Sequence, residues 1–126
     1  MAIAARILPR VDSGGGLAAG VLVLLFRREL SAIEALPEAL LLFTGAANVG
    51  YGLYSGSLLR GVPAAGALRA LVVANAVWAG LCALLAAGTW GGASAWGTAH
   101  LAGEGVYVGL LAWVEYRSFW YATVLR

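Results

Sequence analysis

The stretch ALLLFTGAANVGYGLYSGSLL, residues 39–59, contains no Asp, Glu, Lys, Arg or His over 21 consecutive positions. A second stretch of the same length, ALVVANAVWAGLCALLAAGTW at residues 70–90, shares this property. About 20 such residues span the roughly 30 Å hydrocarbon core of a bilayer when they form an α-helix. The two stretches therefore predict an all-α integral membrane protein.

The overall composition favours the same class. Of the 126 residues, 62% are hydrophobic and only 11% are charged, whereas a soluble domain usually carries about 25% charged residues. So few charges cannot cover a water-facing surface. All eight basic residues are arginines, and we assign them to orientation in the bilayer. We therefore expect the lipid bilayer as a partner and no nucleic acid.

The apolar pattern divides the chain into four spans in a single domain, at roughly residues 13–26, 37–59, 66–87 and 95–116. The links RRELSAIEAL, RGVPAA and GTWGGAS are short. Short links make sequential helices antiparallel, so we expect a four-helix up-down-up-down bundle.

The arginines predict the orientation of this bundle. With both termini in the cytoplasm, six arginines lie on the inner side, and only Arg27 and Arg28 lie outside. The positive-inside rule favours this arrangement, which predicts a multi-pass protein of the bacterial plasma (inner) membrane. The N-terminal apolar run resembles a secretory signal, but no clear A-x-A cleavage site follows it, so we interpret it as a retained span.

The first span is short, covering only about 22 Å at 1.5 Å per residue. Asp12 and Ser13 are residue types that commonly cap helix N-termini. We therefore expect the first helix to begin at the glycines that follow them. An earlier start, with Arg10 reaching toward the interface, is the alternative.

The first loop carries its own helical pattern. Leu30, Ile33 and Leu36 recur every three residues, which predicts a short helix on the outer interface. Glu34 and Glu38 are interpreted as solvated acids near a helix start. A cation held by the two carboxylates is the alternative.

Several polar residues fall inside the predicted spans. Counted from the inner arginines at 1.5 Å per residue, Glu104, Asn48 and Cys82 all lie about 18–20 Å up their helices. Tyr107 lies one turn inward from Glu104, and Asn75 lies lower on the third helix. We predict an intramembrane polar cluster formed by Asn48, Glu104, Tyr107, Asn75 and Cys82.

Glu104 is the most informative member of this cluster. An ionised carboxylate facing lipid costs at least about 2.5–3.5 kcal/mol. We therefore predict that Glu104 faces the bundle, is largely protonated, and lies within hydrogen-bonding reach of Asn48, with Tyr107 as a second partner. It either holds helices together or binds a proton or cation.

His100 lies one turn before Glu104 on the same face, and the two residues are a candidate proton relay. The alternative is an ordinary interfacial histidine. A metal site needs more ligands, and the chain has no second histidine, so we predict neither a metal nor a cofactor. Cys82 is the only cysteine, which excludes an internal disulfide and the thiol oxidoreductases that need cysteine pairs.

Small residues line up on two spans. Asn48, Gly52 and Gly56 share one face of the second span, and Gly105 and Gly109 share one face of the fourth. Such spacing permits the close approach of another helix backbone.

Four stretches, RVDS at 10–13, LPEALLLFTG at 36–45, LRALVVANAVWA at 68–79 and GTAHLAGEGVYVGLLAWVEYR at 97–117, together resemble a group of small bacterial membrane proteins with four spans. In that group an asparagine-alanine-tryptophan stretch corresponds to residues 75–78, and an acidic residue precedes an aromatic as Glu115 precedes Tyr116. The resemblance covers most of the chain and implies a fold but no activity.

The sequence contains no nucleotide-binding loop, no Ser-His-Asp set and no metal motif, so we do not expect an enzyme. The leading hypothesis is a small non-enzymatic membrane protein: a scaffold, an accessory subunit of a larger complex, or a homo-oligomer packed through its glycines. The alternative is a small proton-coupled or cation transporter that uses Glu104.

Overall fold

The computed structural model describes residues 4–61 and 63–120, and this part of the chain is helical with no strand. The all-α prediction is confirmed. The five α-helices are α1 (Ala4–Leu25), α2 (Arg27–Glu34), α3 (Glu38–Ser57), α4 (Ala65–Gly88) and α5 (Ala95–Glu115). A 3₁₀ turn, Leu58–Arg60, follows α3, and a π-helical turn, Tyr116–Trp120, follows α5.

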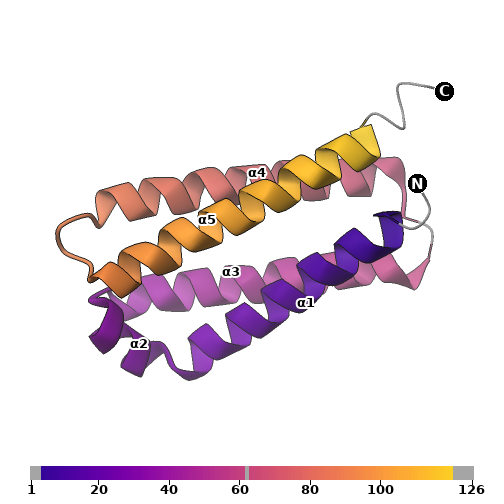
Figure 1. Cartoon of the computed structure of the whole chain (residues 1–126). Helices are drawn as coiled ribbons and strands as arrows, with labels where there is room; N and C mark the ends of the chain where they lie inside the picture. The colour runs from indigo at the N-terminus through magenta and orange to yellow at the C-terminus, as the bar shows by residue number, and fades with distance from the viewer. Residues whose placement is uncertain (1–3, 62, 121–126) are drawn as a thin grey trace.

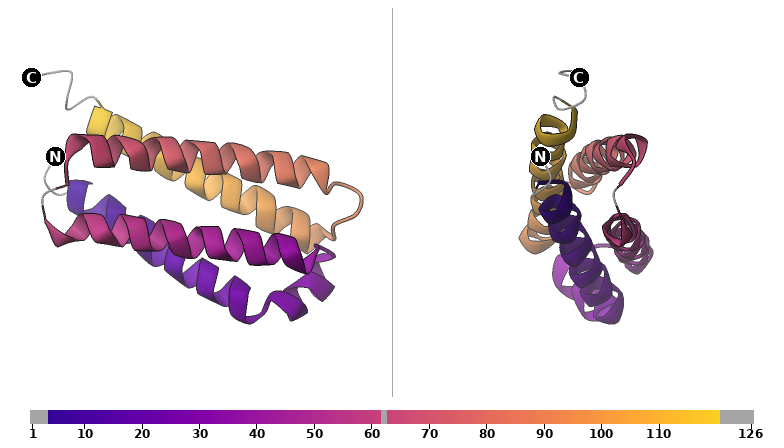
Figure 2. Two further views of the ribbon diagram at one scale, coloured as in Figure 1. Left: turned by 180° about the vertical axis from the view of Figure 1, so that it is seen from behind. Right: turned by 90° about the vertical axis from the view of Figure 1, so that its right-hand side faces the viewer.

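The four long helices form two closely packed pairs. Helix α1 lies along α3, and α4 lies along α5, whereas contacts between the pairs are sparser (Figure 1). Successive long helices run in opposite directions, so the start of α1 and the end of α5 lie at the same end of the molecule. Seen nearly end-on, the two pairs face each other as two layers (Figure 2). Side chains of all four helices therefore meet between the layers.

Helix α1 is longer than the sequence pattern predicted. It begins at Ala4 rather than near Ser13 and includes Pro9, so Asp12 is an interior helix residue and not an N-cap. Its 22 residues extend about 33 Å, which removes the apparent shortness of the first span. Two of the three glycines after Asp12 lie at close range to neighbouring helices: a Cβ atom on Gly16 would lie 2.9 Å from the Asn48 carbonyl oxygen, and one on Gly15 would lie 2.7 Å from the Tyr107 hydroxyl.

The glycine faces predicted on the second and fourth spans pack against other helices of the same chain. A Cβ atom on Gly52 of α3 would lie 2.8 Å from the Leu17 backbone nitrogen of α1. One on Gly105 of α5 would lie 3.2 Å from the Cβ atom of Cys82 in α4. These faces close the α1–α3 and α4–α5 pairs, so they supply no argument for a homo-oligomer.

The short helix predicted in the first loop is present as α2. Ala35 ends it in the left-handed conformation, at φ 51°. The last residue of α2 is held to the loop before α5, where the Ser94 backbone nitrogen donates to the Glu34 carbonyl oxygen at 2.8 Å. Leu36 is buried in the core cluster at this end. These contacts pack the end of α2 against the first turn of α5.

Two segments among the described residues are long and apolar enough to cross a membrane, Ile7–Leu25 within α1 and Ala65–Gly88, which is α4. This criterion concerns length and composition only.

Candidate functional site

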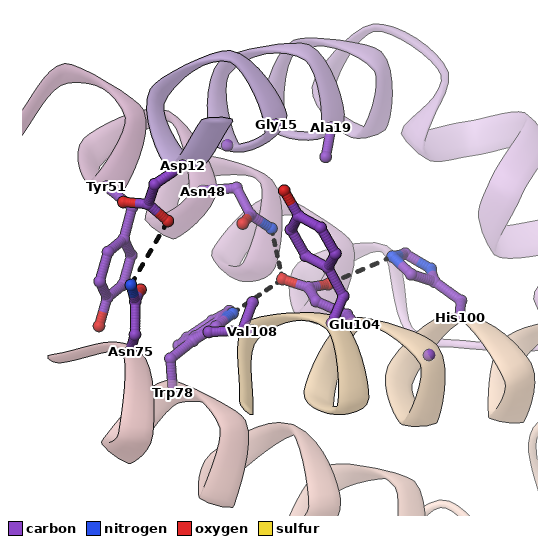
Figure 3. Close-up of a pocket in the computed structure, with 13 residues that line it drawn as sticks. Asp12, Gly15, Ala19, Asn48, Tyr51, Asn75, Trp78, His100, Glu104 and Val108 are labelled. Atoms are coloured by element: carbon purple, nitrogen blue, oxygen red, sulfur yellow. Dashed lines mark hydrogen bonds and ion pairs between the residues drawn. The ribbon is translucent and has the colours of Figure 1, made fainter. Parts of the chain in front are cut away.

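Glu104, on the middle of α5, lies at the centre of a hydrogen-bond network between the two helix pairs (Figure 3). Its Oε1 atom accepts hydrogen bonds from Asn48 Nδ2 of α3 at 2.6 Å and from Trp78 Nε1 of α4 at 2.8 Å. Its Oε2 atom lies 3.5 Å from His100 Nε2, one turn earlier on α5. The carboxylate thereby connects three helices.

The structure brings Asn48 and Glu104 together, as their matched depths led us to expect. It does not place Tyr107 in hydrogen bonding with Glu104. The Tyr107 hydroxyl instead faces α1, where a Cβ atom on Gly15 would lie 2.7 Å from it. Tyr107 points across the space between the layers because α1 presents glycine at that level. Trp78 occupies the second donor position.

His100 joins Glu104 to a further carboxylate, Glu34 of α2. His100 Nδ1 lies 3.0 and 2.9 Å from the two carboxylate oxygens of Glu34. With Nδ1 facing Glu34, a single proton can reside on His100 Nε2 or on Glu104 Oε2, which is the geometry of a relay. Whether Glu104 is protonated stays a prediction.

The interpretation of Glu34 as a solvated acid is wrong. Only 6% of the residue is exposed, because the turn at Ala35 and the contact with the loop before α5 place it against His100. No residue spacing in the sequence indicates this contact, since it joins a short loop helix to a distant span. Glu38, by contrast, is partly exposed and lies 3.0 Å from Arg27 Nε.

A second polar cluster lies further along the same interlayer space, toward the start of α1. Asn75 Nδ2 of α4 donates to Asp12 Oδ1 at 3.5 Å and to Glu115 Oε2 at 3.0 Å. Ser55 of α3 donates to Asp12 Oδ2. The polar residues of the predicted cluster are thus divided, with Asn48 at Glu104 and Asn75 between two other carboxylates. Asp12 and Glu115 were outside the predicted cluster, although Glu115 lies close to the His100–Glu104 face of its helix.

Cys82, predicted at the depth of Glu104, is fully buried with a free thiol. It belongs to an apolar cluster with Trp78 and Val108. Its position on the side of α4 that meets Gly105 makes it a packing residue between α4 and α5.

A cavity of about 280 Å³ lies between the layers and connects the two polar clusters. All four long helices contribute to its wall, and the labelled side chains converge on it in Figure 3. Its described lining carries two carboxylates, one imidazole, two amides and three large aromatic rings, but no Arg. Its lining residues are Asp12, Gly15, Gly16, Ala19, Asn48, Tyr51, Asn75, Trp78, His100, Gly103, Glu104, Tyr107 and Val108.

Within residues 4–61 and 63–120, no group of three or more His, Cys, Asp or Glu side chains is arranged to hold a metal ion. The carboxylates, amides and imidazole of the site can exchange protons, form hydrogen bonds and attract positive charge. Comparisons with protein-family models, with curated proteins and with solved structures found no match for this chain.

Proposed function

We propose that this chain is an integral membrane protein whose four long helices cross the bilayer, and that it moves a small organic cation in exchange for protons. Three observations support the proposal that the chain crosses a membrane. Residues 39–59 carry no charged side chain, and Ile7–Leu25 and Ala65–Gly88 are long and apolar enough to span a bilayer. The third observation is that many large apolar side chains face outward. Large exposed apolar residues occur on all four long helices, among them Leu22, Leu25, Leu42, Leu53, Val77, Leu84, Val106 and Leu110. Such a surface suits lipid better than water.

The observation that carries the transport proposal is the composition of the cavity wall. Asp12 and Glu104 place two carboxyl groups in the wall, and none of the described Arg side chains lines the cavity. The rings of Tyr51, Trp78 and Tyr107 also line it, and aromatic faces attract cations within about 6 Å. A volume of about 280 Å³ exceeds the share of one water, about 30 Å³, by enough for a small organic cation.

Proton exchange follows from the chain Glu34–His100–Glu104. Glu104 is the member of this chain that both lines the cavity and contacts His100. A cation beside Glu104 favours its ionised form, and release of the cation favours its protonated form. Competition between a proton and a cation for one carboxylate is sufficient to couple their movements.

The test uses purified protein in liposomes that contain a pH-sensitive dye. An imposed gradient of tetramethylammonium is expected to drive proton movement with the wild-type protein and not with Glu104→Gln. Glu38→Gln, an acid outside the cavity, serves as the matched control and should behave as the wild type does. Equal proton movement with wild type and Glu104→Gln, or none with wild type, would contradict the proposal. Absence of flux together with one stoichiometric co-purifying protein would favour an accessory subunit instead.

A further inference from the structure

The second polar cluster has too few hydrogen-bond donors for two ionised carboxylates. Asp12, Ser55, Asn75 and Glu115 come from the four long helices and are all buried. Glu115 has 0% of its surface exposed. Among the described residues, no ion pair reaches Asp12 or Glu115, and the observed contacts that stabilise a negative charge here are hydrogen bonds.

The amide of Asn75 supplies two of the available hydrogens. One N–H is directed to Asp12 Oδ1 and the other to Glu115 Oε2. The remaining oxygen of Glu115, Oε1, is buried and has no hydrogen-bond partner among the described residues. An ionised carboxylate with a bare buried oxygen is far more costly than a neutral acid in the same place.

The hydroxyl of Ser55 supplies only one hydrogen, yet two acceptors lie within its reach. One is Asp12 Oδ2, and the other is the Tyr51 carbonyl oxygen at 2.9 Å. If Asp12 carries a proton on Oδ2, it donates to Ser55 Oγ, and Ser55 donates in turn to the Tyr51 carbonyl. Both contacts are then satisfied. Two ionised carboxylates would therefore leave at least one acceptor without a hydrogen-bond donor. A proton on Asp12 or on Glu115 supplies the missing donor.

We infer that Asp12 and Glu115, bridged by Asn75, form a proton-binding site that holds one proton at neutral pH. Tyr51 of α3 and Tyr107 of α5 interact electrostatically with this pair, and both are neutral near pH 7 and supply no positive charge. Asp12 lines the cavity whereas Glu115 does not, so protons reach the pair through Asp12. Figure 3 places Asp12 and His100 on opposite sides of Glu104, and this site is therefore distinct from the Glu34–His100–Glu104 chain.

The inference does not depend on transport, and infrared spectroscopy of the purified protein at pH 7 tests it directly. A protonated carboxyl gives a C=O stretching band that a carboxylate lacks. Glu104→Gln, in which residue 104 cannot contribute a carboxyl band, is expected to show this band. Adding Asp12→Asn and Glu115→Gln to that variant is expected to remove it, because both carboxyl groups of the pair are gone.

Variants in which one member of the pair is replaced keep the test decisive if the variant lacking both fails to fold. In Glu104→Gln/Glu115→Gln, Asp12 gains sole use of the nearby donors and ionises, so the band should again be lost. Glu104→Gln/Asp12→Asn should have the same effect through Glu115. The inference is overturned if Glu104→Gln lacks the band at pH 7, or if the band persists when either member of the pair is replaced in Glu104→Gln.

Discussion

Glu34 Oε2 lies 2.9 Å from His100 Nδ1, although Glu34 ends a loop helix and His100 stands in a predicted span. The contact fastens α2 to α5 and gives the imidazole a carboxylate on each side, with Glu104 on the other. The proposed relay therefore includes a carboxylate from outside the four long helices.

This contact predicts that Glu34 contributes much more to the free energy of unfolding than Glu38, although both lie near the turn at Ala35. Glu34→Gln removes one partner of a buried charged pair, which should lower the free energy of unfolding by about 3 kcal/mol. Glu38→Gln affects a carboxylate that is 47% exposed, and exposed pairs contribute about 0–1 kcal/mol. Chemical denaturation of both variants in the same detergent measures the difference. Equal losses of unfolding free energy in the two variants would show that the buried Glu34–His100 contact stabilises the protein no more than an exposed ion pair does.

Trp78 should contribute through its indole N–H as well as its ring. Trp78→Phe keeps an aromatic ring but removes a donor to Glu104 Oε1, and we expect a loss of about 1–2 kcal/mol in the free energy of unfolding. Trp96→Phe is the matched control because Trp96 is 72% exposed. An unfolding midpoint for Trp78→Phe as high as that of the control would argue against the hydrogen bond.

The glycines of α1 predict a position-specific response to added methyl groups. In Gly20→Ala, the new Cβ atom would lie 2.7 Å from the Gly45 carbonyl oxygen and from the Val49 backbone nitrogen. Helix α1 must then move away from α3, at a cost of about 1–3 kcal/mol. Gly80→Ala on α4 meets nothing within 4 Å and should be neutral or stabilising by up to about 1 kcal/mol. The order of unfolding midpoints in one detergent checks both expectations, and the reverse order would contradict the close α1–α3 packing.

The proposed membrane orientation predicts the side of each terminus and loop. Reporter domains fused after residue 126 should report the cytoplasm, whereas reporters inserted at residues 91–94 should report the opposite side. The six inner arginines provide the physical reason. Reporters found on the same side at both positions would exclude four spans with this orientation.

The apolar runs were sufficient to predict the helical class and the approximate positions of the long helices. Depth counting along those helices also predicted that Asn48 and Glu104 lie at one level, and the structure joins them by a 2.6 Å hydrogen bond. These inferences succeed because the rise of a helix is constant at 1.5 Å per residue. A distance along one helix can therefore be compared with a distance along another.

The sequence by itself determined the helical class, the alternating order of the long helices and the level of Asn48 and Glu104, since periodicity and helical rise are local properties, but it misplaced the start of α1. Only the tertiary structure decided which groups meet. It buried Glu34 against His100 through the turn at Ala35, and it placed Asn75 between Asp12 and Glu115 rather than at Glu104. The physical reason is that partner choice depends on how each helix is rotated and paired. In this chain the pairing of α1 with α3 and of α4 with α5 depends on close glycine contacts between segments far apart in sequence.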